Sequence, residues 1–469
     1  MRELQFLMDR ELHEECGVFG IFNVAQASDV TYYALHAMQH RGQEGCGIVT
    51  TDGNKLIGHR GFGGVKEVFQ ESDLKRCVGT SGIGHVRYST AGGRHLSNIQ
   101  PFMFMHGTGD FALCHNGNLV NSKQMKKKFE DNGSIFQSSS DSEILAHLIT
   151  KNSKSNRIDA IKEALPQLEG AFAFLVLTKD KIYAMRDKYG LRPLSLGKIN
   201  GGYVVSSETC AFDVIGAEFI RDVLPGEIIT ISKDGVDSTF YDEKPVNRIC
   251  AMEYIYFSRP DSDLCGINVH NSRKSCGKQL AIETPIEADI VIGVPDSSLS
   301  AASGYAEESK IPLEMGLIKN RYTGRTFIEP SQQLREKGVK MKLSPIRSVV
   351  NGKRIVVVDD SIVRGTTSKQ IITMLREMGA KEVHMRIASP PIVSPCFYGV
   401  DTNTYEELIS AYTSNDDVCK MIGADTLGYL SEEGLCKAIG TNEMCLACFN
   451  GKYPTPLFDS IKDANKEEK

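Results

Sequence analysis

The chain has 469 residues, of which 41% are hydrophobic and 24% are charged, and its formal net charge is −5. That length is too great for one hydrophobic core and predicts two or three domains of ordinary globular composition. The negative charge argues against a dedicated nucleic-acid binder, and no apolar run approaches the roughly eighteen residues of a transmembrane helix. The lead MRELQFLMDRELHEE is too acidic for a signal peptide. We therefore expect a cytoplasmic protein with neither membrane nor nucleic-acid partners.

Cys16 stands between this lead and the apolar run GVFGIF, which predicts a first strand. Residues 1–15 look expendable, so one interpretation is that they form a propeptide and that the mature protein begins at Cys16. A new N-terminus there would carry an α-amine with a pKa near 8, which is close enough to neutrality to act as a general base.

The first half, to about residue 245, reads as short strands separated by Gly-rich turns. Helical patterns occur at 30–40, 121–131 and 141–150, and strand patterns at GVFGIF, GCGIVTTDG, FAFLVL, KIYAMRD and GYVVSSE. Many strands with a few helices predict a layered α+β domain.

The second half changes character. ADIVIGVP, KRIVVVDD and KEVHMRIASPP are apolar runs without alternation, as expected for buried parallel strands. Polar small residues and a helical pattern follow each of the first two runs. This βαβ rhythm predicts a doubly wound α/β domain, followed by a charged tail.

The stretch VVVDDSIVRGTTS, residues 356–368, ends a buried strand in Asp359 and Asp360. Carboxylates at that edge can hold ribose hydroxyls or Mg²⁺, and the amides and hydroxyls of a helix start suit a terminal phosphate. The plainer alternative is an N-capped helix with surface acids.

This stretch resembles the signature of type I phosphoribosyltransferases, which bind 5-phosphoribosyl-1-pyrophosphate (PRPP). The resemblance implies that the two acids contact the ribose and the loop binds the 5-phosphate. It also matches GVPDSSLSAA with a pyrophosphate loop and KNRYTGRTFIEPSQQLRE with a mobile basic loop, for which a solvated charged loop is the plainer alternative. The implied PRPP-binding residues are Asp296, Ser298, Lys319, Arg321, Asp359, Asp360, Arg364, Gly365, Thr366 and Thr367; the implied Mg²⁺ ligands are Ser297, Asp359 and Asp360.

Polar clusters beside glycine turns mark the first half, at ECGVFG, QHRGQEG, GHVRYST, HNGNLVN and SSSDSE. Singly each is weak, since Asn-Gly is an ordinary hairpin turn and an arginine can simply lie on the surface. Together, in this order, they resemble the glutaminase domain of class II (N-terminal-nucleophile) glutamine amidotransferases. The implied roles are nucleophile and base for Cys16, oxyanion hole for Asn116 and Gly117, and glutamine binding for Arg41, Arg87 and Asp141.

In a reducing compartment the thirteen cysteines do not predict a disulfide framework, and their number is odd in any case. Most read as small buried apolar residues. Cys250, Cys396, Cys445 and Cys448 are spread over nearly two hundred residues and suggest a metal staple for the C-terminal segment. The residues alone leave structural zinc and an iron–sulfur cluster both open.

A glutaminase domain followed by a phosphoribosyltransferase domain resembles the glutamine-dependent phosphoribosyltransferases that begin purine synthesis, in their iron–sulfur, propeptide-bearing form. The resemblance implies an αββα sandwich at 16–245, a parallel-sheet α/β domain with the cluster segment at 246–455, and a tail at 456–469. It implies that ammonia from glutamine displaces pyrophosphate from C1 of PRPP to give 5-phosphoribosylamine. It favours a 4Fe-4S cluster over zinc, and it implies Mg²⁺, a homotetramer and inhibition by purine nucleotides (AMP, GMP, ADP).

Two other functions would share part of this pattern. A sugar-phosphate aminotransferase would share the glutaminase domain but should carry a sugar isomerase in place of VVVDDSIVRGTT. A PRPP-binding DNA regulator would lack the catalytic cysteine and would carry a basic DNA-binding module. The sequence fits neither alternative.

Overall fold

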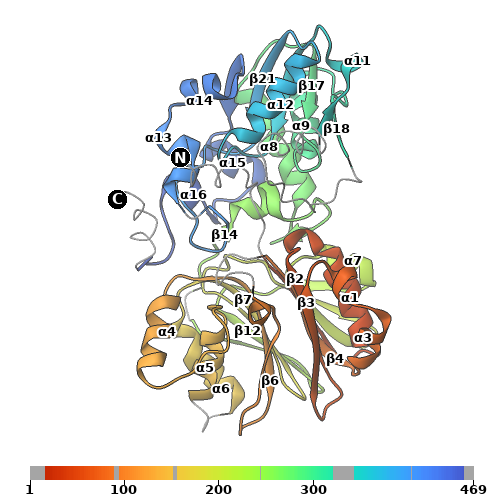
Figure 1. The fold of residues 1–469 in the computed structure, drawn as a ribbon, viewed down its shortest axis with the longest axis vertical. Helices are drawn as coiled ribbons and strands as arrows, with labels where there is room; N and C mark the ends of the chain where they lie inside the picture. Colours follow the sequence, from red (N-terminus) through yellow and green to blue (C-terminus); the bar gives the residue numbers. More distant parts are fainter. Residues whose placement is uncertain are drawn as a thin grey trace.

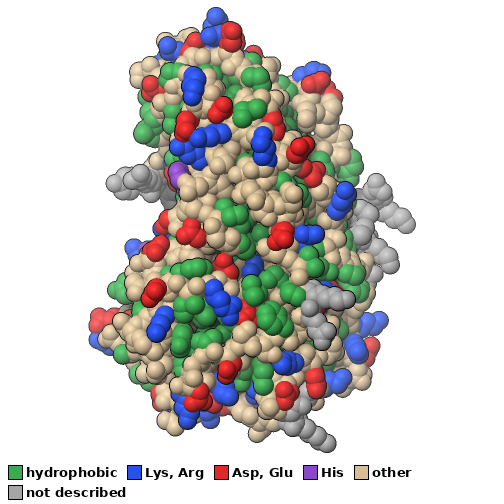
Figure 2. Space-filling model, turned by 180° about the vertical axis from the view of Figure 1, so that it is seen from behind, with side chains coloured by type: hydrophobic (Ala, Val, Ile, Leu, Met, Phe, Trp, Pro, Cys, Tyr) green, Lys and Arg blue, Asp and Glu red, His purple; other side chains and the backbone are tan. Residues whose placement is uncertain are grey.

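The structure of the chain is a computed structural model that describes residues 16–88, 95–151, 156–242, 245–320, 343–402 and 404–458. The two halves of the chain form two regions stacked along the long axis (Figure 1). Positive and negative side chains are interspersed over both regions on the face shown in Figure 2. Across the described ranges, no helix is both long and apolar enough to cross a membrane.

One antiparallel sheet of the first region has seven strands, in the order β11-β9-β10-β1-β4-β2-β3. β1 is central, with β4 and β10 on its two sides. Cys16 therefore stands at the entrance to the middle of a sheet. The strands are β1 (Gly17–Phe22), β2 (Gly45–Thr51), β3 (Leu56–Phe62), β4 (Ser81–Arg87), β9 (Ser195–Ile199), β10 (Gly202–Ser206) and β11 (Glu218–Asp222).

A second antiparallel sheet has six strands, in the order β13-β12-β8-β7-β6-β5. Its longest strand pair, β6 with β7, places Asn116 opposite Ala173. The strands are β5 (Phe102–Phe104), β6 (Phe111–Leu119), β7 (Gly170–Leu177), β8 (Ile182–Arg186), β12 (Glu227–Ser232) and β13 (Gly235–Phe240).

Helices cover the outer face of each sheet, which confirms the predicted αββα sandwich. Phe19 and Ile21 pack towards the helix after β1, whereas Val18 and Phe22 pack in the core between the sheets. This alternation follows from the two-residue period of a strand. The first sheet carries α1 (Ala27–Ala37), η1 (Gln39–Arg41), α2 (Val65–Val68), α3 (Glu71–Arg76) and α7 (Cys210–Ile215). The remaining elements are η2 (Leu96–Asn98), η3 (Leu165–Gln167), α4 (Ser122–Asp131), α5 (Glu143–Lys151) and α6 (Arg157–Ala164).

The predicted helix at 30–40 is α1, and it lies three residues earlier in the structure. Ala27, in its first turn, is buried in the core, so the apolar face of the helix extends beyond the predicted start. The other two predicted helices correspond to α4 and α5.

The second region is built on a four-stranded sheet with the order β17-β20-β21-β22, in which all three pairings are parallel. Val356 and Val358 of β20 face one core, and Ile355 and Val357 face the other. Helices therefore cover both faces, which confirms the predicted α/β domain. The main elements are α8 (Val269–Glu283), β17 (Ile290–Gly293), α9 (Leu299–Ser309), β20 (Arg354–Asp359), α12 (Thr366–Glu377), β21 (Glu382–Ile387), α14 (Asn415–Ile422) and β22 (Thr426–Tyr429).

Shorter elements border this sheet. They are η4 (Glu253–Phe257), β15 (Asp263–Leu264), β16 (Ile267–Asn268), β18 (Leu317–Lys319), β19 (Leu343–Pro345), α11 (Arg347–Val350), η5 (Tyr405–Glu407) and α13 (Ile409–Tyr412).

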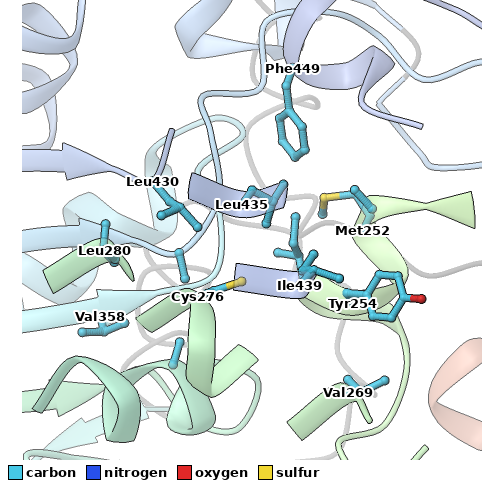
Figure 3. Packing of buried hydrophobic residues seen from close by; sticks show 14 of the residues in the cluster. Met252, Tyr254, Val269, Cys276, Leu280, Val358, Leu430, Leu435, Ile439 and Phe449 are labelled. Carbon is cyan, nitrogen blue, oxygen red and sulfur yellow. The ribbon is translucent and has the colours of Figure 1, made fainter. Parts of the chain in front are cut away.

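The C-terminal segment returns to the start of the second region. Its elements are α15 (Glu432–Ile439), β23 (Met444–Cys445) and α16 (Ala447–Asn450), and β23 pairs in parallel with β14 (Ile249–Cys250). Leu435 and Ile439 of α15 pack in one core with Met252 and Tyr254 (Figure 3). The segment is thus part of the core of this region.

Candidate active site

Cys16 directly precedes β1, and its Sγ lies 3.6 Å from the carbonyl oxygen of Tyr88 just beyond β4. The residue keeps some exposed surface, but burial of its sulfur raises the pKa of the thiol. The Asp141 carboxylate acts in the same direction, whereas the Arg87 guanidinium opposes the shift. The resting thiol therefore holds its proton at neutral pH, and a base is needed to generate the thiolate.

Arg87 and Asp141 both lie close enough to Cys16 to influence its charge. Arg87 ends β4, is buried, and pairs with Glu44 Oε2 at 3.6 Å. Asp141 Oδ2 accepts a hydrogen bond of 2.8 Å from the Leu119 amide. Burial alone would raise the pKa of Asp141, but His115 and this amide hold it below its ordinary value. The site thus offers a cation and an anion within electrostatic range of one thiol.

Asn116 and Gly117 lie in β6 of the opposite sheet. Asn116 is fully buried, and its Nδ2 donates to Ser207 Oγ over 3.4 Å. Gly117 has φ +137°, and a Cβ there would lie 2.1 Å from the carbonyl oxygen of Ala171. Only glycine fits this backbone, so no side chain projects from the strand next to the asparagine amide.

Arg41 is placed differently from its predicted role. Its guanidinium is fully buried and donates to Glu208 Oε1 at 2.7 Å and to the two carboxylate oxygens of Glu253 at 2.9 and 2.8 Å. Its Nε donates to the carbonyl oxygen of Cys16 at 3.2 Å. This geometry does not support direct glutamine binding by Arg41. It makes Arg41 a brace for the backbone of Cys16.

The predicted carboxylate pair lies at the carboxyl end of β20. Ser298 Oγ donates to Asp359 Oδ1 at 2.9 Å, and Ser297 Oγ donates to Asp360 Oδ2 at 2.5 Å. Burial, with the neighbouring charge of Asp360, raises the pKa of Asp359 to about 8; burial also raises the pKa of Asp360. Two buried carboxylates side by side favour a bound cation, which would relieve their repulsion.

The loop after these acids leads into α12. Gly365 has φ +74° and precedes the first turn, where Thr366 and Thr367 lie. Arg364 Nη2 donates to Glu407 Oε1 at 2.7 Å, and both side chains are largely buried. The structure brings together the sequence-predicted carboxylates and the phosphate-loop residues, as the parallel sheet requires.

Within the described residues, one ion pair joins the predicted pyrophosphate loop (293–302) to the start of the predicted basic loop (319–336). Lys319 Nζ at the end of β18 lies 2.9 Å from Asp296 Oδ2, and both side chains are exposed. Arg321 lies outside the described residues.

The four predicted metal cysteines line a single apolar pocket at the junction of the two regions, with about 510 Å³ of atom-free space that is partly open to solvent. Cys250 and Cys445 are register partners in the β14–β23 pair, and Cys448 lies in α16. Burial raises the pKa values of Cys250 and Cys445 to about 12.

These thiols do not converge into a ready ligand set. No group of three or more His, Cys, Asp or Glu side chains lies close enough to hold a metal ion anywhere in the described ranges. The donor chemistry nevertheless fits a thiolate-bound group. The backbone amide of Tyr398 donates to Cys396 Sγ at 3.4 Å, and the positive charge of Arg192 opposes the raised pKa of Cys250. Hydrogen bonds to sulfur and nearby positive charge both favour the thiolate form.

Several residues that the sequence reasoning missed support these sites. Glu253 accepts hydrogen bonds from Arg41 and from Arg192 Nη1, the latter at 3.3 Å, while Arg192 Nη2 donates to the Tyr398 carbonyl oxygen at 2.7 Å. A buried ionic network therefore links the backbone of Cys16 to the wall of the cysteine pocket. No local pattern could have revealed it, because Arg41 and Glu253 are far apart in the chain. His115 is also new, although it directly precedes the Asn-Gly pair.

Two family descriptions match the chain. A glutamine amidotransferase domain matches residues 85–214, and a phosphoribosyl transferase domain matches residues 278–388. A cysteine at the entrance of an αββα sandwich and paired acids at the edge of a parallel sheet agree with these matches. Together they define a glutamine amidotransferase joined to a phosphoribosyltransferase.

Similar proteins match nearly the whole length. Amidophosphoribosyltransferase of Bacillus subtilis (strain 168) is 57% identical over 464 residues, which cover 97% of this chain and 98% of that protein. Amidophosphoribosyltransferase of Staphylococcus aureus (strain COL) is 50% identical over 456 residues, covering 96% and 92%. The structure of glutamine PRPP amidotransferase from B. subtilis complexed with ADP and GMP superposes with a TM-score of 0.91 at 56% identity, covering 94% of this chain and 98% of that one.

The chain therefore belongs to the amidophosphoribosyltransferase family. This confirms the sequence-based expectation of an enzyme that uses glutamine and PRPP in the first step of purine biosynthesis.

Proposed function

We propose that glutamine is hydrolysed at Cys16 after removal of residues 1–15. The α-amine of Cys16 takes the thiol proton, the thiolate attacks the side-chain amide carbon, and nitrogen leaves as ammonia. Water then releases glutamate from the thioester. Asn116 Nδ2 and the backbone N–H of Gly117 stabilise the oxyanion, while Arg87 and Asp141 hold the α-carboxylate and α-ammonium of glutamine. The observation that carries this proposal is that Arg87 and Asp141 both lie within electrostatic range of the Cys16 thiol, at the entrance to β1.

The ammonia then displaces pyrophosphate from C1 of PRPP bound at the edge of β20. Asp359 and Asp360 hold the ribose hydroxyls, and the start of α12 with Arg364 to Thr367 holds the 5-phosphate. Asp296, Ser298, Lys319 and Arg321 bind the pyrophosphate in this proposal. Mg²⁺ would be held by Ser297 with the two acids, and its charge would offset that of the leaving group. The raised pKa values of the paired acids support a cation partner there.

For the cysteine pocket we propose a 4Fe-4S cluster held by Cys250, Cys396, Cys445 and Cys448. Four thiols in an apolar pocket, with an amide donor to sulfur, support this assignment. The cluster would supply a cross-link between the C-terminal segment and the junction of the two regions. We divide the chain accordingly into a propeptide (1–15), a glutaminase domain (16–245), a phosphoribosyltransferase domain with the cluster segment (246–455) and a tail (456–469).

The descriptions of two similar structures support regulation by nucleotides. The B. subtilis protein was solved with ADP and GMP, and another similar structure is described as the allosteric regulatory enzyme of purine biosynthesis. We propose that purine nucleotides, AMP included, inhibit this enzyme and that it works as a homotetramer in the cytoplasm.

The glutaminase assignment is tested by measuring pyrophosphate release from PRPP for the wild type and for Cys16→Ala. The variant should lose glutamine-dependent synthesis, because no thiolate remains, and should keep synthesis driven by added ammonia. Cys77→Ala, at a buried cysteine of the same domain, is the control. A Cys16→Ala variant that used glutamine at the wild-type rate would contradict the assignment.

A further inference from the structure

His115 lies on β6, the strand of Asn116. Its contacts reach two other segments of the proposed glutamine site, β4 with Arg87 and the loop with Asp141. Its backbone amide donates to Gln100 Oε1 at 2.7 Å. Its carbonyl oxygen lies 3.0 Å from His85 Nε2, two residues before Arg87 on β4. Because a carbonyl can only accept, His85 Nε2 carries a hydrogen. The backbone of His115, on the same strand as Asn116, is therefore tied to Gln100 and to the strand that carries Arg87.

The ring of His115 is held just as firmly. It stacks on Phe174 with a centroid distance of 4.1 Å and an interplanar angle of 20°. Nε2 lies 3.4 Å from the Ala171 carbonyl oxygen and so carries a hydrogen there. A Cβ on Gly117 would lie 3.0 Å from the same nitrogen, which shows how closely the oxyanion turn packs on the ring.

The other ring nitrogen faces Asp141. His115 Nδ1 lies 3.0 Å from Ser142 Oγ and 3.7 Å from Asp141 Oδ1. Ser142 Oγ in turn donates to Asp141 Oδ1 at 3.3 Å. One imidazole thus contacts the proposed oxyanion turn on one side and the proposed ammonium-binding carboxylate on the other.

We propose that His115 is a positioning residue that orients Asp141 towards the α-ammonium of glutamine and thereby makes the enzyme selective for α-amino amides. The inference rests on the proposed role of Asp141. A purely structural histidine would stabilise the domain without affecting the choice of amide. His115 differs from such a residue because its Nδ1 edge is directed at Ser142 and Asp141.

The test compares glutamine with 4-carbamoylbutanoate, the same amide without the α-amino group. His115→Phe keeps a ring that can stack on Phe174 but removes both nitrogens, so KM for glutamine should rise about tenfold, as expected when an ionic group loses one partner. Turnover of the carbamoylbutanoate and synthesis from ammonia should stay unchanged. His115→Asn, whose amide reaches the Nδ1 side, should restore most of the selectivity, and His115→Gln should not. His59→Phe, on β3 in the same domain, is the control.

Equal losses with both amides in His115→Phe, or no loss with either, would overturn the inference. If His115→Phe does not fold, the comparison of His115→Asn with His115→Gln tests the inference. Equal selectivity for glutamine in these two variants would overturn the positioning role of His115. Asp141→Asn distinguishes an error in the proposed role of Asp141 from an error in the proposed role of His115. If that variant keeps full selectivity for glutamine, the role of Asp141 is wrong and this inference falls with it. If it loses selectivity while His115→Phe keeps it, only the role of His115 is wrong.

Discussion

Cys16 combines a thiol that holds its proton with a position that can supply its own base. Burial raises the pKa of the thiol, so an unassisted thiolate is scarce at neutral pH. An α-amine created by a cut between Glu15 and Cys16 would have a pKa of about 8 and would belong to the same residue as the sulfur.

We therefore expect the intact mass of glutamine-active protein to correspond to a chain that begins at Cys16. A variant in which cleavage is blocked should keep ammonia-dependent synthesis and lose glutamine use, because its amine is tied up as an amide. Mass spectrometry on one sample identifies the N-terminal residue, and assays with glutamine and with ammonia on the same sample measure the two activities. Full glutamine activity from a chain that retained Met1–Glu15 would contradict the expectation.

Asp359 and Asp360 should be needed whichever nitrogen donor is supplied. Replacing both by Asn keeps the side-chain size but removes the charge that would hold the ribose or Mg²⁺. Synthesis should fall by on the order of a hundredfold with glutamine and with ammonia alike. Asp416→Asn on α14, an exposed acid of the same domain, serves as the control in the pyrophosphate assay. Unchanged synthesis with either donor would remove these acids from the PRPP site.

Single residues show how far the sequence could lead. Cys16, Asn116 and Asp141 lie in glycine-rich motifs whose order was informative, and the structure brings them together. Arg41 lies in an equally clear motif, but its buried partners Glu208 and Glu253 are distant in the chain. The motif around Arg41 predicts glutamine binding, whereas its contacts in the folded structure hold the backbone of Cys16 in place.

At the scale of elements, the parallel strands were predictable and the short pair β14–β23 was not. β17 and β20 are nearly continuous apolar runs because both of their faces are covered. β21 differs, because its sequence EVHMRI alternates and its His384 and Arg386 are buried together with the apolar residues. β14 and β23 have two residues each, too few for any periodicity. Only the cysteines within them indicated that the two segments meet.

That pair leads to a prediction about metal content. Protein purified without oxygen should be brown and carry about four irons per chain, the load of one four-cysteine cubane. Air should bleach the colour and inactivate the enzyme, because the cross-link through the C-terminal segment is lost. Visible absorption measures the colour, and elemental analysis measures the iron. Cys445→Ala should lose both, whereas the matched control Cys419→Ala should keep both. Colourless, fully active protein with stoichiometric zinc would contradict the prediction.

At the scale of the molecule, the two regions meet across buried charges. Glu208 and Glu253 are fully buried. Against the effect of burial, His40 and then Arg41 hold the pKa of Glu208 below its ordinary range, and Arg41 and then Arg192 do the same for Glu253. A carboxyl with a lowered pKa in the folded state stabilises the fold above its unfolded pKa of ~4.3, and this contribution disappears as the pH falls through the folded pKa.

Glu253→Gln should consequently cost about 3–5 kcal/mol in the free energy of unfolding at pH 7, because Arg41 and Arg192 remain buried with too little negative charge. The difference between variant and wild type should shrink as the pH falls below about 4 towards the lowered pKa of the folded carboxyl, because the unfolded wild type takes up protons there before the folded state does. Denaturant unfolding over a pH series measures both effects. Glu287→Gln, at a side chain that is 95% exposed, should match the wild type throughout. A cost for Glu253→Gln that did not change with pH would contradict the ionic explanation.

The pairing of Cys250 with Cys445 also sets an order of events during synthesis. These register partners are about 195 residues apart, and the pocket wall also includes Ala447 and Cys448. A ribosome has released the whole αββα sandwich from its exit well before it reaches this last segment, and domains generally fold as they emerge. The glutaminase half can therefore fold while the cysteine pocket still lacks a wall. Nascent chains and C-terminally truncated products lack the complete pocket, so the pocket can close only when synthesis of the chain is nearly finished.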